Sequence, residues 1–294
     1  MVIRLKRKYL IAAAACLSVL FVLGVLIRTA GLASETSARP AAAAQGRELP
    51  VIMYHQLTDT AAQAGEYVLT ARQFEADMRY ICSRGYTSVT TQQLIDYAHG
   101  RAELPEKPIL ITFDDGYESF IPYALPILEE LNMYAVVSVI GSVAQTYTDT
   151  VDHNIKYSHL SWEAIAQLAA NPHVEIGNHT YDLHKLDTGR RGCKIKPGED
   201  ETAYKAMLTQ DLTRVQELVQ QYTGTVPKTF AYPFGARCSQ SKEVLEQMGF
   251  QVVLTCAEQV NHITSQSADW LCSIGRFNRP SGKTSEQFFK NILV

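Results

Sequence analysis

The fold of this chain is decided by the stretch Ile109-Leu110-Ile111-Thr112-Phe113-Asp114-Asp115-Gly116. Its apolar part is β-branched and too short for a helix, so it predicts a buried strand. Because the run is apolar on both faces, we expect a parallel sheet that is covered on both sides. Active-site residues of such folds collect at the carboxyl ends of strands, and side chains alternate along a strand. The two adjacent acids could therefore serve different partners, a metal and a substrate. The alternative is an ordinary Asp-Gly turn.

Short apolar runs recur along the chain and alternate with helical patterns. This order predicts βα units and a parallel sheet. Seven or so units indicate a distorted (β/α) barrel with about seven parallel strands, and an open doubly wound sheet is the alternative. The further predicted strands are residues 49–55, 86–89, 135–140, 174–179, 228–232, 250–255 and 272–277.

Three helix ends can be read from local signals. Thr70 with Gln73, and Thr90 with Gln93, have the spacing of a capping box, so a helix is expected to begin after each threonine. The periodic apolar positions of a longer helix stop before Gly224, where a C-terminal glycine is typical. These helices are expected to cover the sheet.

The N-terminus has the pattern of a membrane anchor. Basic residues precede an apolar run over residues 9–27, which is about as long as a helix that crosses a bilayer. Basic residues on that side favour a cytoplasmic N-terminus and export of the bulk of the chain. We therefore predict a signal-anchor helix in residues 1–30, a flexible linker in residues 31–47 and one folded domain in residues 48–294. Secretion after cleavage near Ala33 is the alternative.

The remaining composition excludes some partners. A formal net charge of −3 with no basic stripe argues against nucleic acid. The cysteines show no Cys-x-x-Cys spacing, and a bridge between Cys256 and Cys272 is one open pairing. Residues 185–201 predict an exposed polar loop that could touch an acidic glycan, although a solvated surface loop is favoured. Its basic residues are Lys185, Arg190, Arg191, Lys194 and Lys196.

Two histidines follow the strand predicted at residues 174–179. His179 and His184 are five positions apart, so they would not share a face of a helix, but they can converge where a strand ends in a turn. Neutral imidazole suits Zn, Fe, Ni and Cu. Two histidines and one carboxylate from another strand make a three-ligand catalytic site, with Asp115 or Asp114 as the third ligand. A structural histidine pair is the alternative.

The order of these motifs resembles the polysaccharide deacetylase family, also called the NodB homology domain or carbohydrate esterase family 4. Its first three motifs are similar to Thr112-Phe113-Asp114-Asp115-Gly116, His179-Thr180-Tyr181-Asp182-Leu183-His184 and Tyr232-Pro233-Phe234-Gly235. The opening Pro50-Val51-Ile52-Met53-Tyr54-His55 resembles the branch that includes the poly-N-acetylglucosamine deacetylases. The resemblance implies a distorted (β/α) barrel with seven strands.

The resemblance also implies a division of roles. Asp115, His179 and His184 would bind a divalent metal, with Zn²⁺ favoured. Asp114 would be the general base, and His55 the general acid that protonates the departing amine. This division suits the chemistry, because an amide needs both a polarised carbonyl and a protonated leaving group.

The resemblance in the third motif implies residues that face the substrate. This motif also contains one departure from the family. The backbone N–H of Phe234 would help to hold the oxyanion, and Tyr232 belongs to the same substrate-facing motif. Many relatives carry an arginine near the catalytic base where this chain has Ala231. Arg276 or Arg279 could replace it.

The sequence thus predicts a metal-dependent hydrolase that removes N-acetyl groups from a GlcNAc-containing cell-surface polysaccharide and releases acetate. The polymer could be peptidoglycan, poly-N-acetylglucosamine or a chitin-like oligomer. The alternatives are a catalytically weak glycan-binding or assembly protein, and an O-acetyl esterase on the same fold. His262 is a weaker rival of His55 for the general acid.

Overall fold

A computed structural model gives the fold of residues 46–186 and 189–293. Residues from Gly46 onward form one compact unit. The predicted signal anchor and residues 31–45 of the predicted linker lie outside the described residues. Arg47, at the end of that predicted linker, already opens strand β1 (Arg47–Leu49). Within the two described ranges, no helix is both long and apolar enough to cross a membrane.

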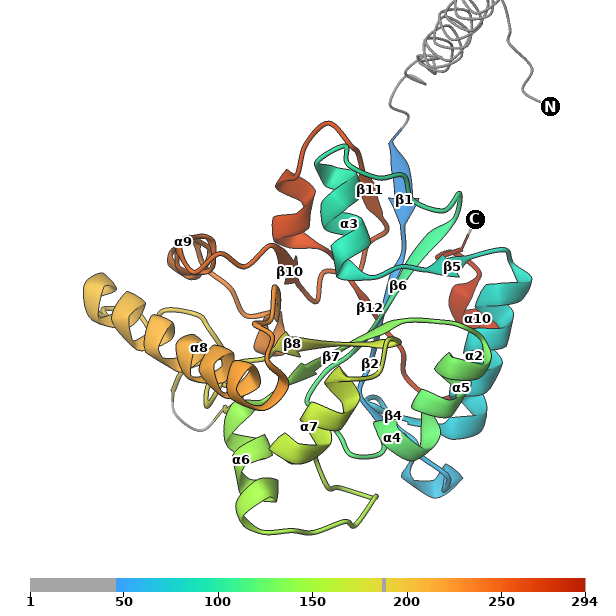
Figure 1. The fold of residues 1–294 in the computed structure, drawn as a ribbon, viewed down its shortest axis with the longest axis horizontal. Coiled ribbons are helices and arrows are strands. Elements are labelled where there is room, and N and C mark those ends of the chain that lie inside the picture. Colours follow the sequence, from blue (N-terminus) through green and yellow to red (C-terminus); the bar gives the residue numbers. More distant parts are fainter. Residues whose placement is uncertain (1–45, 187–188, 294) are drawn as a thin grey trace, which may run out of the picture. The chain divides into compact units, whose positions relative to one another are not determined.

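Parallel strands form the central sheet (Figure 1). In spatial order they are β10 (Val252–Leu254), β9 (Thr229–Ala231), β8 (Val174–Asn178), β7 (Ala135–Val139), β6 (Pro108–Phe113), β2 (Val51–Tyr54) and β12 (Phe277–Asn278). The short strand β5 (Thr87–Ser88) also pairs with β6, and every pairing in this sheet is parallel. The predicted parallel α/β architecture with about seven strands is confirmed.

One short segment joins the two edges of this sheet. Ile274 forms a parallel bridge with Leu254 of β10, and Phe277 of β12 then pairs with Ile52 of β2. The N–H of Thr255 donates to the Ile274 carbonyl at 2.8 Å. The sheet therefore curves until its first and last strands share this segment, which we call the closing segment (residues 274–278).

Alternate residues of β6 face different cores. Ile109, Ile111 and Phe113 pack in one cluster, and Leu110 packs in another with residues of β2, β7, β9 and β10. Both clusters include residues of the covering helices. All six residues of β6 are buried. The apolar run is continuous because both faces are covered, as the sequence predicts.

Helices surround the strands (Figure 1). They are α2 (Ala71–Ser83), α3 (Thr91–Ala98), α4 (Phe120–Tyr123), α5 (Leu125–Glu130), α6 (Gly141–Asp149), α7 (Trp162–Ala169), α8 (Glu201–Thr223), α9 (Ser239–Gln247) and α10 (Ser285–Phe289). The capping boxes predicted at Thr70 and Thr90 both form. Helix α8 ends at Gly224, whose φ of 74° is the left-handed conformation expected there.

One expectation about the C-terminal part is wrong, and one open pairing is decided. The strand predicted at residues 272–277 is instead a 3₁₀ helix, η3 (Asp269–Ser273), followed by the short strand β12. The side chain of Asn261 explains part of the difference, because it hydrogen-bonds both the N–H and the carbonyl of Gly275 and so replaces a strand partner. Cys256 and Cys272 are both free, so the bridge considered between them is absent.

Candidate active site

The two acids at the end of β6 differ in backbone conformation. The N–H of Asp114 still donates to Tyr54 of β2 at 3.0 Å, so Asp114 continues the strand. Asp115 has a φ of 70° and Gly116 a φ of 71°, so the chain turns sharply after Asp114. Aspartate is one of the few residues other than glycine that adopt this left-handed conformation. This turn brings both carboxylates to the same cavity, which strand alternation alone would not do.

The two histidines converge on Asp115. Their Nε2 atoms lie 3.5 Å (His179) and 3.3 Å (His184) from Asp115 Oδ1. The ligand atoms of the three residues all lie within 4.8 Å of one another. Nδ1 of His179 is 2.8 Å from the carbonyl oxygen of Ala231, so Nδ1 carries the hydrogen and Nε2 presents its lone pair. Asp115 Oδ1 is buried without a hydrogen-bond partner, so this donor set fits a divalent cation.

A turn between the histidines is shaped by two residues that the sequence interpretation missed. Thr180 has a φ of 70°, and its N–H donates to the side chain of Asn178 at 2.9 Å. Asp211 of α8 accepts from the N–H groups of Tyr181 and Asp182, at 2.8 Å each. The β-branched Thr180 is unusual in this conformation, and these hydrogen bonds hold it there.

Asp114 is paired with a buried arginine. Arg276 of the closing segment donates to both carboxylate oxygens of Asp114 at 2.8 Å, and it also donates to the carbonyl of Thr255. Burial alone would raise the pKa of Asp114, but the charge and hydrogen bonds of Arg276, together with nearby His179, hold this pKa well below its usual range. The carboxylate is therefore ionised at neutral pH.

His55 follows β2 and lies beside the two acids. Burial lowers the pKa of its imidazole, and the negative charges of Asp114 and Asp115 oppose this effect. Its Nδ1 is buried without a hydrogen-bond partner. The ring instead contacts the ring of Tyr67 edge to face, with their centroids 4.9 Å apart.

These side chains line one cavity of about 600 Å³, a volume typical of small-molecule sites. Phe234 lines it from a 3₁₀ turn, η2 (Pro233–Gly235), and its ring centroid is 4.3 Å from that of His184. The cavity is lined by Met53, His55, Glu66, Tyr67, Asp114, Asp115, Tyr117, His179, His184, Leu186, Arg191, Phe234, Cys256, Glu258, Arg276 and Asn278. The polar residues that the sequence interpretation missed here include Tyr67, which lies in a loop without a motif, and Tyr117, which directly follows Gly116.

Three candidate residues do not line this cavity. The hydroxyl of Tyr232 lies 3.1 Å from Ser241, in a buried cluster. Arg279 donates to Asp77 at 2.7 Å and 3.0 Å, so Arg276 is the arginine placed beside Asp114. His262 lies on β11 (Asn261–Ile263), which pairs with β1.

The polar loop of residues 185–201 contributes fewer basic side chains to the cavity than its sequence suggested. Only Arg191 of its five basic residues lines the cavity. Arg190 is paired with Glu199, and Lys185 with Asp182. The basic charge of this segment is therefore partly neutralised within the protein.

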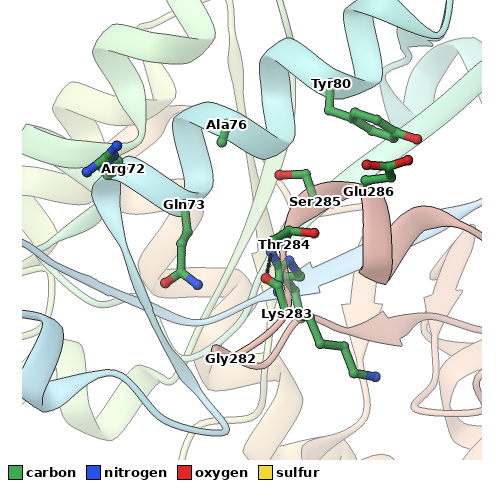
Figure 2. Close-up of a pocket in the computed structure, with 10 residues that line it drawn as sticks. Arg72, Gln73, Ala76, Tyr80, Gly282, Lys283, Thr284, Ser285 and Glu286 are labelled. Atoms are coloured by element: carbon green, nitrogen blue, oxygen red, sulfur yellow. Dashed lines mark hydrogen bonds between the residues drawn. The ribbon is translucent and has the colours of Figure 1, made fainter.

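A second hollow, of about 690 Å³, lies between α2 and residues 282–286 (Figure 2). It is lined by one face of α2 from Arg72 to Tyr80, and Arg279 borders it. Among the described residues, the one group of side chains suited to hold a metal is Asp115 with the two histidines. We therefore assign the chemistry to the smaller cavity.

Comparisons with known proteins agree with this geometry. A family model described as polysaccharide deacetylase matches residues 101–253, just over half of the chain. A poly-β-1,6-N-acetyl-D-glucosamine N-deacetylase of Escherichia coli K12 is 24% identical over 264 residues, covering 83% of this chain. The chain spans only 38% of that relative's length.

Two solved structures share the fold. IcaB from Ammonifex degensii is 28% identical with a TM-score of 0.67, and the match covers 81% of this chain and 94% of that one. A de-N-acetylase from Aggregatibacter actinomycetemcomitans is 25% identical with a TM-score of 0.70, and the match covers 84% and 100%.

Proposed function

Because the chain belongs to the polysaccharide deacetylase family, we propose that it is a metal-dependent hydrolase that removes N-acetyl groups from a GlcNAc-containing polysaccharide. One observation carries the proposal. Three ligand atoms from two strand ends converge within 4.8 Å, and a separate, ionised carboxylate lies beside them. Amide hydrolysis needs this combination, a Lewis acid and an independent base.

Asp115, His179 and His184 would hold the metal, and two imidazoles with one carboxylate favour Zn²⁺. The cation would polarise the acetyl carbonyl and lower the pKa of water at the site. The carbonyl of Ala231 fixes the tautomer of His179, and so keeps its Nε2 available as a ligand.

Asp114 is the proposed general base. Arg276 occupies both of its oxygens from one side and keeps it ionised, so the carboxylate can accept the proton of the attacking water. Held in this way, Asp114 does not need to bind the cation. Its strand conformation and the turn at Asp115 together separate the base from the ligand.

His55 is the proposed general acid. Its imidazole lines the same cavity, on a neighbouring strand end, and would donate a proton to the amine nitrogen as the C–N bond breaks. The N–H of Phe234 would donate to the oxyanion. Positioned acid–base groups of this kind typically contribute about 10²–10⁴-fold each.

The substrate and the cellular location rest on different support. The similarity to the E. coli poly-β-1,6-N-acetyl-D-glucosamine N-deacetylase favours an N-acetylglucosamine polymer, and the similarity to the Aggregatibacter de-N-acetylase favours an N-acetyl group as the one removed. The basic tip and apolar run of residues 1–30 support a membrane anchor with the catalytic domain outside the cell. Acetate and a free amine on the polymer are the proposed products.

The experiment uses the full chain, stripped of metal with a chelator and then given Zn²⁺. Acetate release is measured from poly-β-1,6-N-acetylglucosamine, peptidoglycan and chitin oligomers. The proposal requires metal-dependent release from at least one of them. No release from any N-acetylated glycan by the Zn²⁺-loaded protein, or release from O-acetyl substrates only, would reject it.

Two variants separate the proposed roles of the adjacent acids. Asp115→Ala is expected to lose both metal binding and activity. Asp114→Asn is expected to keep the metal and lose activity. Loss of the metal in the Asp114 variant would show that the roles are assigned incorrectly.

A further inference from the structure

The two proposed histidine ligands are held in different ways. His179 is fixed by its own bonds, because its N–H donates to Val139 of β7 at 3.0 Å and its Nδ1 donates to the carbonyl of Ala231. The imidazole of His184 lies against two neighbouring rings, whose centroids are 5.0 Å and 4.3 Å away. Ring contacts alone allow several orientations. The position of His184 therefore depends on the turn over residues 180–183 that leads to it.

Helix α6 begins on this turn. The N–H of Gly141 donates to the carbonyl of Thr180 at 3.0 Å, and the N–H of Ser142 donates to the carbonyl of Tyr181 at 2.8 Å. The first N–H groups of a helix have no partner inside it, and these two are satisfied by the turn. On α8, which contacts α6 (Figure 1), Asp211 accepts from the N–H of Tyr181. Both backbone groups of Tyr181 are thus bonded, one to each helix.

The side chain of Tyr181 is enclosed by the same two helices. The guanidinium of Arg214, one turn after Asp211 on α8, lies 3.7 Å from the centroid of the Tyr181 ring. A Cβ atom added at Gly141 would lie 2.5 Å from Cδ2 of Tyr181 and 3.3 Å from its Cα. The first distance is too short for two carbon atoms, so a side chain at Gly141 would have to displace the ring. Since the backbone of Tyr181 is bonded on both sides, the ring cannot move far without moving the turn.

We propose that Gly141 and Arg214 are positioning residues for the proposed metal ligand His184. They act through Tyr181, whose fixed place in the turn sets the separation of His179 and His184. This inference rests on the metal site of the proposed function. Ligands that are already held at the required separation lose less conformational entropy when the cation binds, so fixing the turn strengthens metal binding.

The main test is Gly141→Ala in the full-length protein. Calorimetric titration of the metal-free protein measures its affinity for Zn²⁺. Because the added methyl group displaces the Tyr181 ring, Zn²⁺ binding should weaken by about tenfold or more, as is usual for residues that orient ligands. With poly-β-1,6-N-acetylglucosamine as substrate, kcat at saturating Zn²⁺ should fall by less than about threefold, because excess cation compensates for weaker binding.

The variants of Arg214 test the other side of the ring. Arg214 is exposed, so these variants test the proposal even if Gly141→Ala does not fold. Arg214→Ala should weaken Zn²⁺ binding by about two- to fivefold, the size of a cation–π contact at an exposed site. Arg214→Lys should recover part of this loss, because it keeps a cation near the ring. Glu217→Ala, at an exposed position of the same helix, should bind Zn²⁺ normally.

A second background separates positioning from a general structural effect. Tyr181→Ala removes the ring that the new methyl group would meet. In this background, Gly141→Ala should weaken Zn²⁺ binding by less than about twofold further, because both changes act through one contact. Gly46→Ala is the matched control, since a Cβ atom there would lie 3.5 Å from the carbonyl oxygen of Ile263, an ordinary contact. Its Zn²⁺ affinity should equal that of the wild type.

The outcomes are distinguishable. Unchanged Zn²⁺ affinity in Gly141→Ala and Arg214→Ala, in a protein whose wild type releases acetate, would overturn the positioning role and leave the proposed function standing. An equal effect of Gly141→Ala with and without the Tyr181 ring would also overturn it. Variants that behave as expected in a wild type that binds Zn²⁺ but deacetylates no glycan would support this inference and reject the proposed function. A wild type that binds no Zn²⁺ would overturn both.

Discussion

Arg276 donates two hydrogen bonds of 2.8 Å to Asp114, a residue 162 positions earlier in the chain. Both side chains are almost completely buried. Arg276 thus lies beside the proposed base, where the resemblance to the family leads us to expect an arginine at the position of Ala231. A buried carboxylate that loses such a partner gains a proton more easily, because burial disfavours its charge.

Arg276→Gln should therefore lower kcat far more than metal content. The glutamine can donate one hydrogen bond to Asp114 but carries no charge, so the fraction of ionised base falls at neutral pH. The measurement is kcat with bound Zn²⁺ determined on the same samples. A variant with normal kcat, or one in which lost activity only follows lost metal, would contradict this role.

Arg279 is expected to matter for stability instead. Arg279 and Asp77 are fully buried, and breaking such a pair by removing one partner typically costs about 3–5 kcal/mol. Arg279→Met should lower the free energy of urea unfolding by that amount. Adding Asp77→Leu should recover a large part of the loss, since no unpaired charge then remains. A double variant as unstable as the single one would show that the loss of unfolding free energy comes from lost packing and not from an unpaired charge.

Asp211 should control metal affinity without touching the metal. Its carboxylate holds the N–H groups of Tyr181 and Asp182, and so fixes the turn between the two histidines. Asp211→Ala is expected to weaken Zn²⁺ binding about 10–100-fold, the usual effect of losing a residue that orients ligands. Calorimetric titration of the metal-free protein measures this. Glu217→Ala, at an exposed position of the same helix, is a control that should bind Zn²⁺ normally.

Glu175 should make stability depend on pH. It accepts hydrogen bonds from the N–H and hydroxyl of Thr91, at the start of α3. Burial raises the pKa of Glu175, and the bonds from Thr91 oppose this only partly. The folded state therefore binds this proton more tightly than the unfolded state, and stability falls as pH rises above the unfolded value of about 4.3.

The comparison variant is Glu175→Gln, which has no proton to lose. The unfolding free energy of the wild type minus that of the variant should decrease as the pH rises above about 4.3, and should become constant once the Glu175 carboxyl of the folded state is ionised. Urea unfolding at several pH values measures it. A difference that increases with pH would mean that Thr91 outweighs burial.

The fold was predictable where local pattern and burial agree. The apolar β6 and the capping boxes at Thr70 and Thr90 depend on a few neighbouring residues, so the sequence shows them. The prediction of a strand at residues 272–277 was wrong because the backbone of Gly275 hydrogen-bonds the side chain of Asn261, 14 positions earlier. A contact of this kind leaves no periodic signal.

The candidate site was predictable where its residues lie in short local motifs. The motifs identify the acids and histidines, which the structure brings into one cavity. The sequence left Arg276 and Arg279 as equal choices, because only the path of the closing segment decides which guanidinium reaches Asp114. Asp211 acts through hydrogen bonds to the backbone of the turn, which leave no pattern in the sequence.

The closing segment also has a consequence for the order of synthesis. Every proposed metal ligand and both acid–base residues lie within the first 184 positions, whereas Arg276 is made close to the end of the chain. A polypeptide made as far as β10 contains Asp211 and Ala231, which position the ligands, but lacks the guanidinium of Arg276 that keeps Asp114 charged. We expect such a fragment not to hydrolyse amides, so that activity begins only once the closing segment, with Arg276 and β12, has been synthesised.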